Sequence, residues 1–434
     1  MILVLLLLAL GGLMQAASTY VNEPTSATVQ LAFGYLLLTA FFTGRIANRI
    51  GLPKLTGYII AGALSGPWVF GLVTYDMTKS LAIVSGTATA VIALEAGSEL
   101  QLAKVRRVAR TLRAMTLFAV VGSMFVLGGT LYLLRDLLPF IGELGRPQAL
   151  AVAMVLGVAL SAQSPAVVMA LLAEMRASGP VSELMLASVV VADLVVIICF
   201  SIASAIAGAV LGGSIDLAGT ARDVGWELFG SIGFGLAIGI LLGLFLRQVK
   251  SGGPLFALTM CVVVAEAGPR VHLDPLIVML TAGLWVRNFS RADIHVLHAG
   301  FESAQLPVFL VFFALAGAKL DLDTLVASIV PVAILAGARA ASFFIGGKIA
   351  TRVTDAPPLV HKYAWFGLMP QAGLALALAL VMEKTFPTFG GPAAVIMIGV
   401  VGFNELIAPV ILRAMLLRTG EAGKKEGPAE HVEH

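Results

Sequence analysis

The sequence predicts an all-α membrane protein with many spans, built from two inverted repeats of six helices. Three observations support this fold class. Hydrophobic residues make up 59% of the 434 residues and charged residues 12%, whereas soluble domains carry about 25% charged residues. The apolar residues gather in long runs, which in lipid satisfy their backbone groups by forming helices. The motifs of the first half of the chain also recur, in order, in the second half.

Fourteen hydrophobic segments are expected to form the helices. Many approach the length of about 20 residues that a helix needs to cross a bilayer, and several shorter ones are rich in Gly and Pro. The expected segments are 2–14, 29–49, 54–73, 80–99, 114–134, 148–173, 184–211, 224–246, 254–268, 275–287, 302–318, 325–347, 360–382 and 389–412.

The distribution of basic residues predicts the orientation of these spans. If the loop after segment 29–49 is cytoplasmic, strict alternation places most of the 28 Lys and Arg residues in cytoplasmic loops. Cytoplasmic loops of membrane proteins carry this excess of basic residues. We therefore expect a multi-pass protein of the inner or plasma membrane, with its C-terminus in the cytoplasm.

Both ends of the chain have expected roles outside the repeats. Residues 1–28 hold a hydrophobic helix and an outer loop. The alternative for this region is a removed signal peptide, although it lacks the basic start of such peptides. Residues 419–434 are polar and are expected to form a disordered cytoplasmic tail.

Repeated motifs divide the rest of the chain into two halves. Residues 96–102 (AGSELQL) and 316–322 (AGAKLDL) share the pattern A-G-x-x-L-x-L. Further matches join the prolines Pro53 and Pro275, the motifs 163–165 and 370–373, and the motifs 192–194 and 404–406. Matched segments lie seven apart, an odd number, so the halves have opposite orientations in the membrane, as in many transporters. Repeat 1 covers 29–212, a linker helix 213–253, and repeat 2 254–418.

One carboxylate marks the candidate site. Asp193 is the only charge between Leu184 and Leu211. A charged residue at the centre of a membrane helix costs at least about 2.5–3.5 kcal/mol, so such residues usually face a cavity, an ion or another polar group. The alternative is a buried aspartate that only supports helix packing.

Two helices are expected to be interrupted near this site. Pro165 lies inside segment 148–173, and Pro370 and Gly373 lie inside segment 360–382. Proline cannot donate its backbone nitrogen and clashes with the preceding turn, and paired interruptions in two halves point to transporter binding sites. Free carbonyls there, with the side chains of Ser161, Gln163, Ser164 and Gln371, could offer neutral oxygens to an ion. The alternative is a pair of ordinary proline kinks.

These residues resemble a known family. SAQSPAVVMALLAEMRASGP followed by ASVVVADLVVI is similar to the core of monovalent cation:proton antiporters, in the branch with Kef-like and NapA-like proteins. LPKLTGYIIAGALSGP, AGSEL, FFALAGAKLDL and NELIAPVIL resemble recurrent signatures of that branch, and the resemblance covers roughly residues 29–418. It implies the NhaA-type fold, with crossed discontinuous helices in a core domain and a separate dimerisation domain. It also implies a homodimer in membrane lipid.

The resemblance assigns roles to two charged residues. Asp193 matches the aspartate that binds the ion and the proton in that family. A polar or acidic residue usually precedes it, and here Ala192 stands there instead. Arg339, the only charge between Leu325 and Gly347, matches a basic residue in the middle of a core helix. It would compensate charge near the ion; the alternative is an arginine that packs helices by binding carbonyls.

The expected function is exchange of a monovalent cation (Na⁺ or Li⁺, or K⁺) for protons. A proton and a cation would compete for Asp193, and alternating access would expose it to one side at a time. Because an arginine stays protonated, only one group would titrate, which predicts electroneutral 1:1 exchange. The alternative is a Na⁺-coupled symporter of an organic anion with the same inverted-repeat fold.

Other acidic and amide side chains are assigned supporting roles, and several classes are excluded. Glu405 and Asn404 are the counterparts of the Asp193 motif; Glu405 is expected to support segment 360–382 or to bind an ion. Glu95 would line an inner funnel or simply lie at the interface.

The sequence has no HExxH, GxSxG, CxxC or glycine-rich phosphate loop, so neither an enzyme nor a cofactor is expected. Neither a nucleic-acid site nor a nucleotide-binding regulatory domain is expected.

Overall fold

In the computed structural model, the regular secondary structure of the described part of the chain is entirely helical. That part comprises residues 26–212, 225–249, 252–290, 294–320, 328–386 and 388–424, with the isolated positions 7, 10–12, 14, 15, 219, 222 and 326. Within it, eight helices are long and apolar enough to cross a membrane. The predicted all-α, many-span fold class is thereby confirmed. Most of the first predicted segment and residues 425–434 of the predicted tail lie outside the described residues.

The chain divides into two compact units that cut across the sequence repeats. Unit 1 contains residues 1–101 and 226–320, and unit 2 contains residues 102–225 and 321–425, with the last nine residues assigned to unit 1. Each unit therefore draws the first three or the last three elements from both predicted repeats. The predicted repeats follow one another along the sequence, whereas each packed unit combines half of one predicted repeat with half of the other.

Unit 1 is a bundle in which small residues let helices approach closely. Gly97 lies against the backbone of Leu280, and Gly283 lies against the backbone of Leu94, so neither glycine has room for a Cβ atom. Close approach at small residues is the usual way that membrane helices pack. The helices are α2 (Ser26–Arg49), α3 (Lys54–Ser65), α4 (Tyr75–Ser80), α5 (Ala82–Glu99), α13 (Ser231–Gln248), α14 (Gly253–Ala267), α15 (Pro275–Asn288) and α16 (Ile294–Ala318), with the short η3 (Trp226–Gly230) and η4 (Pro269–Val271).

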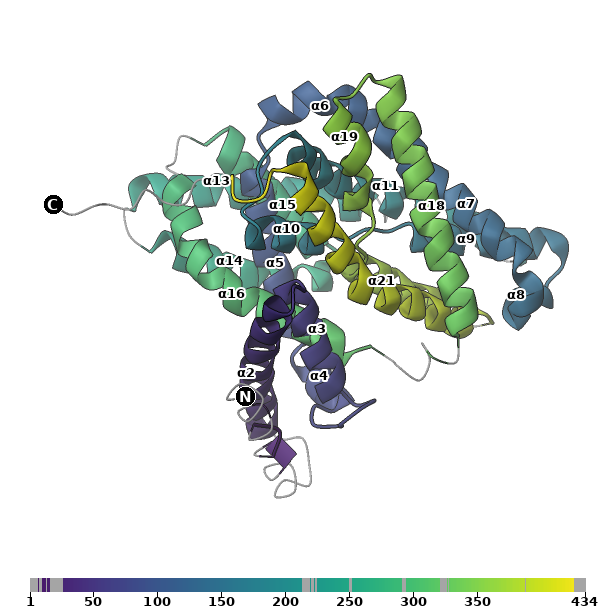
Figure 1. The fold of residues 1–434 in the computed structure, drawn as a ribbon, viewed down its shortest axis with the longest axis horizontal. Helices are drawn as coiled ribbons and strands as arrows, with labels where there is room; N and C mark the ends of the chain where they lie inside the picture. The colour runs from purple at the N-terminus through teal and green to yellow at the C-terminus, as the bar shows by residue number, and fades with distance from the viewer. Residues whose placement is uncertain are drawn as a thin grey trace. The chain divides into compact units, whose positions relative to one another are not determined.

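Unit 2 contains the predicted site residues, and in it α7, α9 and α18 lie side by side (Figure 1). Its helices are α6 (Leu102–Ala114), α7 (Gly122–Leu133), α8 (Pro139–Gly142), α9 (Arg146–Leu160), α10 (Pro165–Glu174), α11 (Pro180–Val210), α18 (Ile329–Val353), α19 (Pro358–Tyr363), α20 (Gly373–Thr385) and α21 (Gly390–Thr419). Short π- and 3₁₀-helical pieces join them: η1 (Met115–Val121), η2 (Arg135–Leu137) and η5 (Ala364–Leu368).

Two helices begin earlier than hydropathy predicted. The segment expected at 114–134 is preceded by α6, a basic amphipathic helix that starts at Leu102 and runs through η1 into α7. The segment expected at 302–318 belongs to α16, which starts at Ile294. A search for apolar runs ends where polar residues begin. A helix can continue beyond that point, with its polar residues on one face.

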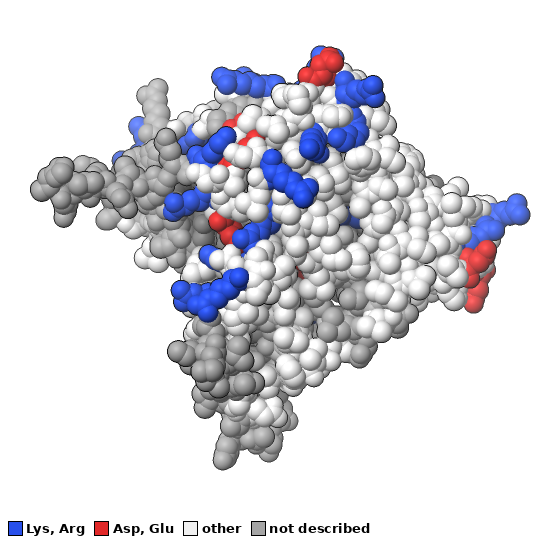
Figure 2. All heavy atoms as spheres, in the orientation of Figure 1, with Lys and Arg blue, Asp and Glu red and all other residues white. Residues whose placement is uncertain are grey.

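The surface of unit 2 has an apolar face between two charged ends. Figure 2 shows few charges over α7 and α18, between the basic residues around α6 and α19 and the charged residues beside α8. Large apolar side chains are exposed on these two helices: Phe125, Leu133, Phe344, Ile345 and Ile349. Such a face suits contact with lipid tails, because apolar side chains at membrane depth cost nothing to expose there.

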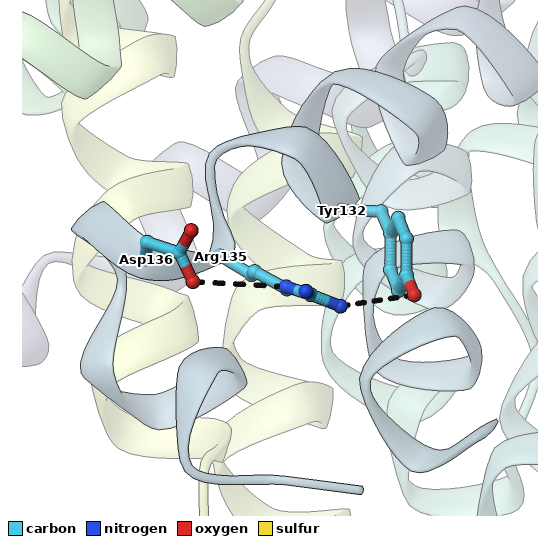
Figure 3. Close-up of polar contacts among 3 residues, drawn as sticks. All are labelled: Tyr132, Arg135 and Asp136. Carbon is cyan, nitrogen blue, oxygen red and sulfur yellow. Dashed lines mark hydrogen bonds and ion pairs between the residues drawn. The ribbon is translucent and has the colours of Figure 1, made fainter. Parts of the chain in front are cut away.

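A polar cluster ends this face where α7 stops (Figure 3). The Arg135 Nη1 donates a hydrogen bond of 3.0 Å to the Tyr132 hydroxyl. Its Nε lies 3.7 Å from the Asp136 Oδ1. Tyrosine and charged residues at the end of an apolar helix are typical of the membrane–water interface.

We predict that Gly157→Ala destabilises unit 2. A Cβ atom at position 157 of α9 would collide with the backbone of Gly128 on α7, so one helix would have to shift. Overpacking of this kind costs about 1–3 kcal/mol. Thermal unfolding in detergent should show a lower midpoint for Gly157→Ala. Gly208→Ala on α11 is the matched control, since nothing lies within 4 Å of its Cβ position. Equal midpoints for the two variants would contradict the prediction.

Candidate functional site

The first interruption separates α9 from α10 at residues 161–164. Ser161 still has a helical conformation, and its hydroxyl donates to the carbonyl of Val158 at 2.6 Å. Ser164 is extended and accepts a hydrogen bond from the Val167 amide at 3.3 Å, so it caps α10, in which Pro165 is the first residue. Serine as cap and proline at the first position are favoured because the first amides of a helix lack partners within it. Residues 155–172, which contain this interruption, are all buried, as non-helical backbone at membrane depth requires.

The second interruption separates η5 from α20 at residues 369–372. Pro370 lies within it, and Gly373 is the first residue of α20. Ala372 has an unusual extended conformation, with φ −164° and ψ −123°. Both interruptions occur in the fifth element of their predicted repeat, at the motifs that the sequence comparison of the two halves had paired.

Arg339 joins the two interruptions. This residue of α18 is 1% exposed, and its guanidinium donates two hydrogen bonds to each interrupted element. The acceptors are the carbonyls of Leu160 (Nε, 3.0 Å), Ala162 (Nη2, 2.7 Å), Met369 (Nη1, 2.6 Å) and Leu368 (Nη2, 3.2 Å). Carbonyls at the end of a helix carry a partial negative charge, which a cation stabilises. Of the two roles considered for Arg339, these contacts match the one in which the arginine packs helices together by binding backbone carbonyls.

A pair of amides reinforces the same junction. Gln371 Nε2 donates to the carbonyl of Leu160 at 3.1 Å, so the second interruption also contacts the first directly. Asn404 Nδ2 donates to the Gln371 Oε1 at 2.9 Å and to the carbonyl of Val400 at 3.0 Å. Asn404 lies on α21, so this helix is fixed to the junction through a chain of two amide side chains.

Asp193 lies on the helix that flanks both interruptions. Helix α11 packs against α9, α10 and η5. At Gly367 of η5, the absence of a Cβ atom lets η5 come close to Met185 of α11. Asp193 is 4% exposed and Ala192 is completely buried. The carboxylate is thus held within the protein rather than at the surface.

Of the other predicted residues, Pro165, Pro370, Gln163 and Glu405 are buried in unit 2, whereas Gly373 is exposed. Gln163 Nε2 donates to the Ser161 carbonyl, while its Oε1 has no hydrogen-bond partner among the described residues. Glu405 is 1% exposed on α21, next to Asn404. Glu95 is buried in unit 1, on α5.

Two buried polar residues of unit 2 were not predicted. The Ser188 hydroxyl on α11 is buried and, in the part of the chain that is described, has no hydrogen-bond partner. A serine within an apolar run gives no sequence signal, because it commonly binds a carbonyl of its own helix. Glu421 was assigned to the disordered tail, which was expected to start at residue 419. The described chain continues to Lys424, and Glu421 is 4% exposed.

We predict that Arg339→Met destabilises the protein strongly. The change removes a donor from four buried carbonyls; that of Leu160 still accepts from the Gln371 amide, and each carbonyl left unsatisfied costs about 1–3 kcal/mol. The unfolding midpoint in detergent should fall by far more than that of Arg352→Met, an exposed residue of the same helix. Arg339→Lys should lie between them, since an ammonium group cannot reproduce the planar fork of donors. A parent-like midpoint for Arg339→Met would refute this role.

Comparison with known proteins agrees with this architecture. The chain matches the family described as sodium/hydrogen exchanger, transmembrane, over residues 36–418. It is 25% identical over 376 residues to a protein of Escherichia coli K12 named "Putative cation/proton antiporter YbaL". The match covers 79% of this chain and 64% of that relative's length.

Solved structures of one archaeal antiporter share the fold. A structure of the sodium proton antiporter MjNhaP1 from Methanocaldococcus jannaschii has a TM-score of 0.66 at 16% identity and covers 91% of this chain and 99% of that one. An electron-microscopy structure of the same antiporter has a TM-score of 0.70 at 15% identity, covering 93% and 100%. The antiporter fold that the sequence predicted is confirmed by these likenesses. The match over most of its length shows that this chain belongs to the sodium/hydrogen exchanger family.

Proposed function

We propose that the protein exchanges protons for monovalent cations (Na⁺ or Li⁺, or K⁺) and that both compete for the carboxylate of Asp193. The observation that carries the proposal is the placement of this acid. It is buried on α11, which packs against two interrupted helices that Arg339 ties together. Isolated ionisable residues in this setting mark ion and proton pathways.

The first interruption supplies neutral oxygens for a cation. Gln163 Oε1 is buried and lacks a hydrogen-bond partner among the described residues, which is costly unless a water or an ion completes it. Ser161 and Ser164 carry hydroxyl oxygens in the same four-residue interruption. One carboxylate and a few neutral oxygens form a shell for a hard, singly charged ion. Asp193, Gln163, Ser161 and Ser164 are the residues that we assign to it.

Coupling follows from the cost of moving an empty carboxylate. Taking an ionised carboxylate out of water costs several kcal/mol. Asp193 is therefore transferred between the two sides of the membrane with either a proton or a cation bound. Alternating access to this one group then makes the exchange obligatory.

The residues around the second interruption hold the site in shape. Arg339 supplies a fixed positive charge and four hydrogen bonds. The Asn404–Gln371 pair connects α21 to the interruptions. We assign Glu405, buried beside Asn404, to support of this region rather than to ion binding.

The assembly and location follow the family. We propose a homodimer in the inner or plasma membrane with the C-terminus in the cytoplasm, since most basic residues would then lie on that side. The transported cation and the proton are substrates, and neither a cofactor nor a nucleotide-regulated step is part of the proposal.

Asp193→Asn should abolish exchange. In proteoliposomes that contain a pH-sensitive dye, addition of Na⁺, Li⁺ or K⁺ should collapse a preset pH gradient through the parent protein. The asparagine variant should leave the gradient at the level of empty liposomes, because its amide cannot bind a proton or balance a cation. Asp136→Asn, at a side chain that is 87% exposed, is the matched control and should behave as the parent.

The proposal fails if Asp193→Asn exchanges cations for protons as fast as the control Asp136→Asn does. Uptake of an organic anion with Na⁺, without proton movement, would instead identify the symporter.

Exchange should be electroneutral. Because Arg339 keeps its proton, one carboxylate titrates and each cycle moves one cation against one proton. The equilibrium cation ratio at a fixed pH difference should then be independent of membrane potential. A cycle that moved one net charge would shift that ratio about 50-fold at about 100 mV. Any potential-dependent shift near this size would disprove the 1:1 count.

A further inference from the structure

The start of α11 is capped by a residue from the far end of the chain. Glu421 follows the end of α21, and its carboxylate is buried against the first turn of α11. Glu421 Oε1 accepts a hydrogen bond from the Val181 amide at 2.9 Å. Its Oε2 accepts from the Ser182 amide at 2.8 Å and from the Ser182 hydroxyl at 2.7 Å.

The local sequence of α11 needs this distant cap. The cap position is Gly179, which has no side chain, and Pro180 is the first helical residue. The amides of Val181 and Ser182 would otherwise lack partners at the positive end of a long helix, where a carboxylate is most stabilising. A Cβ atom at Gly179 would occupy the space of the Glu421 carboxyl group, so the glycine also makes room for it.

Backbone hydrogen bonds fasten the same contact on both sides. The Ser178 amide donates to the carbonyl of Glu421 at 3.1 Å, and the Gly423 amide donates to the carbonyl of Met175 at 2.9 Å. Thr419, the last residue of α21, orients the turn, since its hydroxyl accepts from the Glu421 amide at 3.1 Å. The segment after α21 is therefore tied to the connection between α10 and α11.

We propose that Glu421 is a positioning residue for transport, which holds α11 and α21 in register; this inference rests on the proposed function. Helix α11 carries Asp193, about 18 Å beyond Val181 at 1.5 Å per residue. Helix α21 carries Asn404, which contacts the two interruptions through Gln371. A tie at one end of both helices fixes the axial position of the carboxylate relative to the oxygens that would complete its ion shell.

A cap supplied from within α11 would satisfy the same amides without this coupling. Serine or aspartate at position 179 is the ordinary solution, because such residues cap helices within the same turn. Here the capping group is 240 residues away along the chain from Val181. The arrangement makes the order of α11 depend on the position of α21, which is the property that a positioning role requires.

The experiment compares Glu421→Ala and Glu421→Gln with two controls in the full-length protein. Glu421→Gln keeps the shape of the side chain but loses its charge and one acceptor, so it remains informative if the alanine variant folds poorly. Glu143→Gln removes an exposed carboxylate of unit 2, and deletion of residues 425–434 shortens the tail but keeps Glu421. Hydrogen exchange is measured at the Val181 and Ser182 amides, and the cation KM, the maximal exchange rate and its pH profile are measured in proteoliposomes.

Both Glu421 variants should lose protection at the two amides and raise the cation KM at least about fivefold, at temperatures where they remain folded. The controls should stay within about twofold of the parent. Lost protection with a parent-like KM and pH profile would reduce Glu421 to a structural cap and overturn the positioning role. Unchanged protection of the Val181 and Ser182 amides from hydrogen exchange would show that Glu421 does not hold the start of α11. A parent that exchanges no cation would refute the proposed function, independently of the variants.

Discussion

The hydrogen bonds from Arg339 to the two interrupted helices are the interaction on which unit 2 depends. Interrupting a helix at membrane depth frees carbonyls that water cannot reach, and each costs about 1–3 kcal/mol if it stays unsatisfied. One guanidinium satisfies four such carbonyls, two from each interruption. Its planar set of donors suits this task better than an ammonium group. In the proposed exchange the guanidinium keeps its proton, and the change of charge takes place at the carboxylate of Asp193.

The same junction explains how distant parts of the chain come together. Gln371 and Asn404 extend it to α21, and Glu421 returns from the end of α21 to the start of α11. The elements that carry the site are thus joined by hydrogen bonds at the interruptions and again at the start of α11. In the exchange that we propose, these hydrogen bonds would keep the surroundings of Asp193 unchanged while alternating access exposes it to different sides of the membrane.

The sequence predicted the features that leave a local signature. Pro165 and Pro370 indicated the interruptions because proline cannot continue a helix, and Asp193 and Arg339 stood out as single charges in apolar runs. Which carbonyls Arg339 binds could not be predicted, because every residue has a backbone carbonyl and the sequence does not distinguish these four. Glu421 was missed for the opposite reason: it lies in a polar stretch that composition alone describes as a tail. Helix α6 was missed because an amphipathic helix does not form an apolar run.

The central claim is that one carboxylate holds either a proton or a cation. Its most direct test is the number of protons released per cation bound, measured with purified protein in weakly buffered detergent solution. The account predicts a release that approaches one proton per cation at pH values where Asp193 is protonated, and no release or binding in Asp193→Asn. Cation binding without proton release, or parent-like release from the asparagine variant, would contradict the claim.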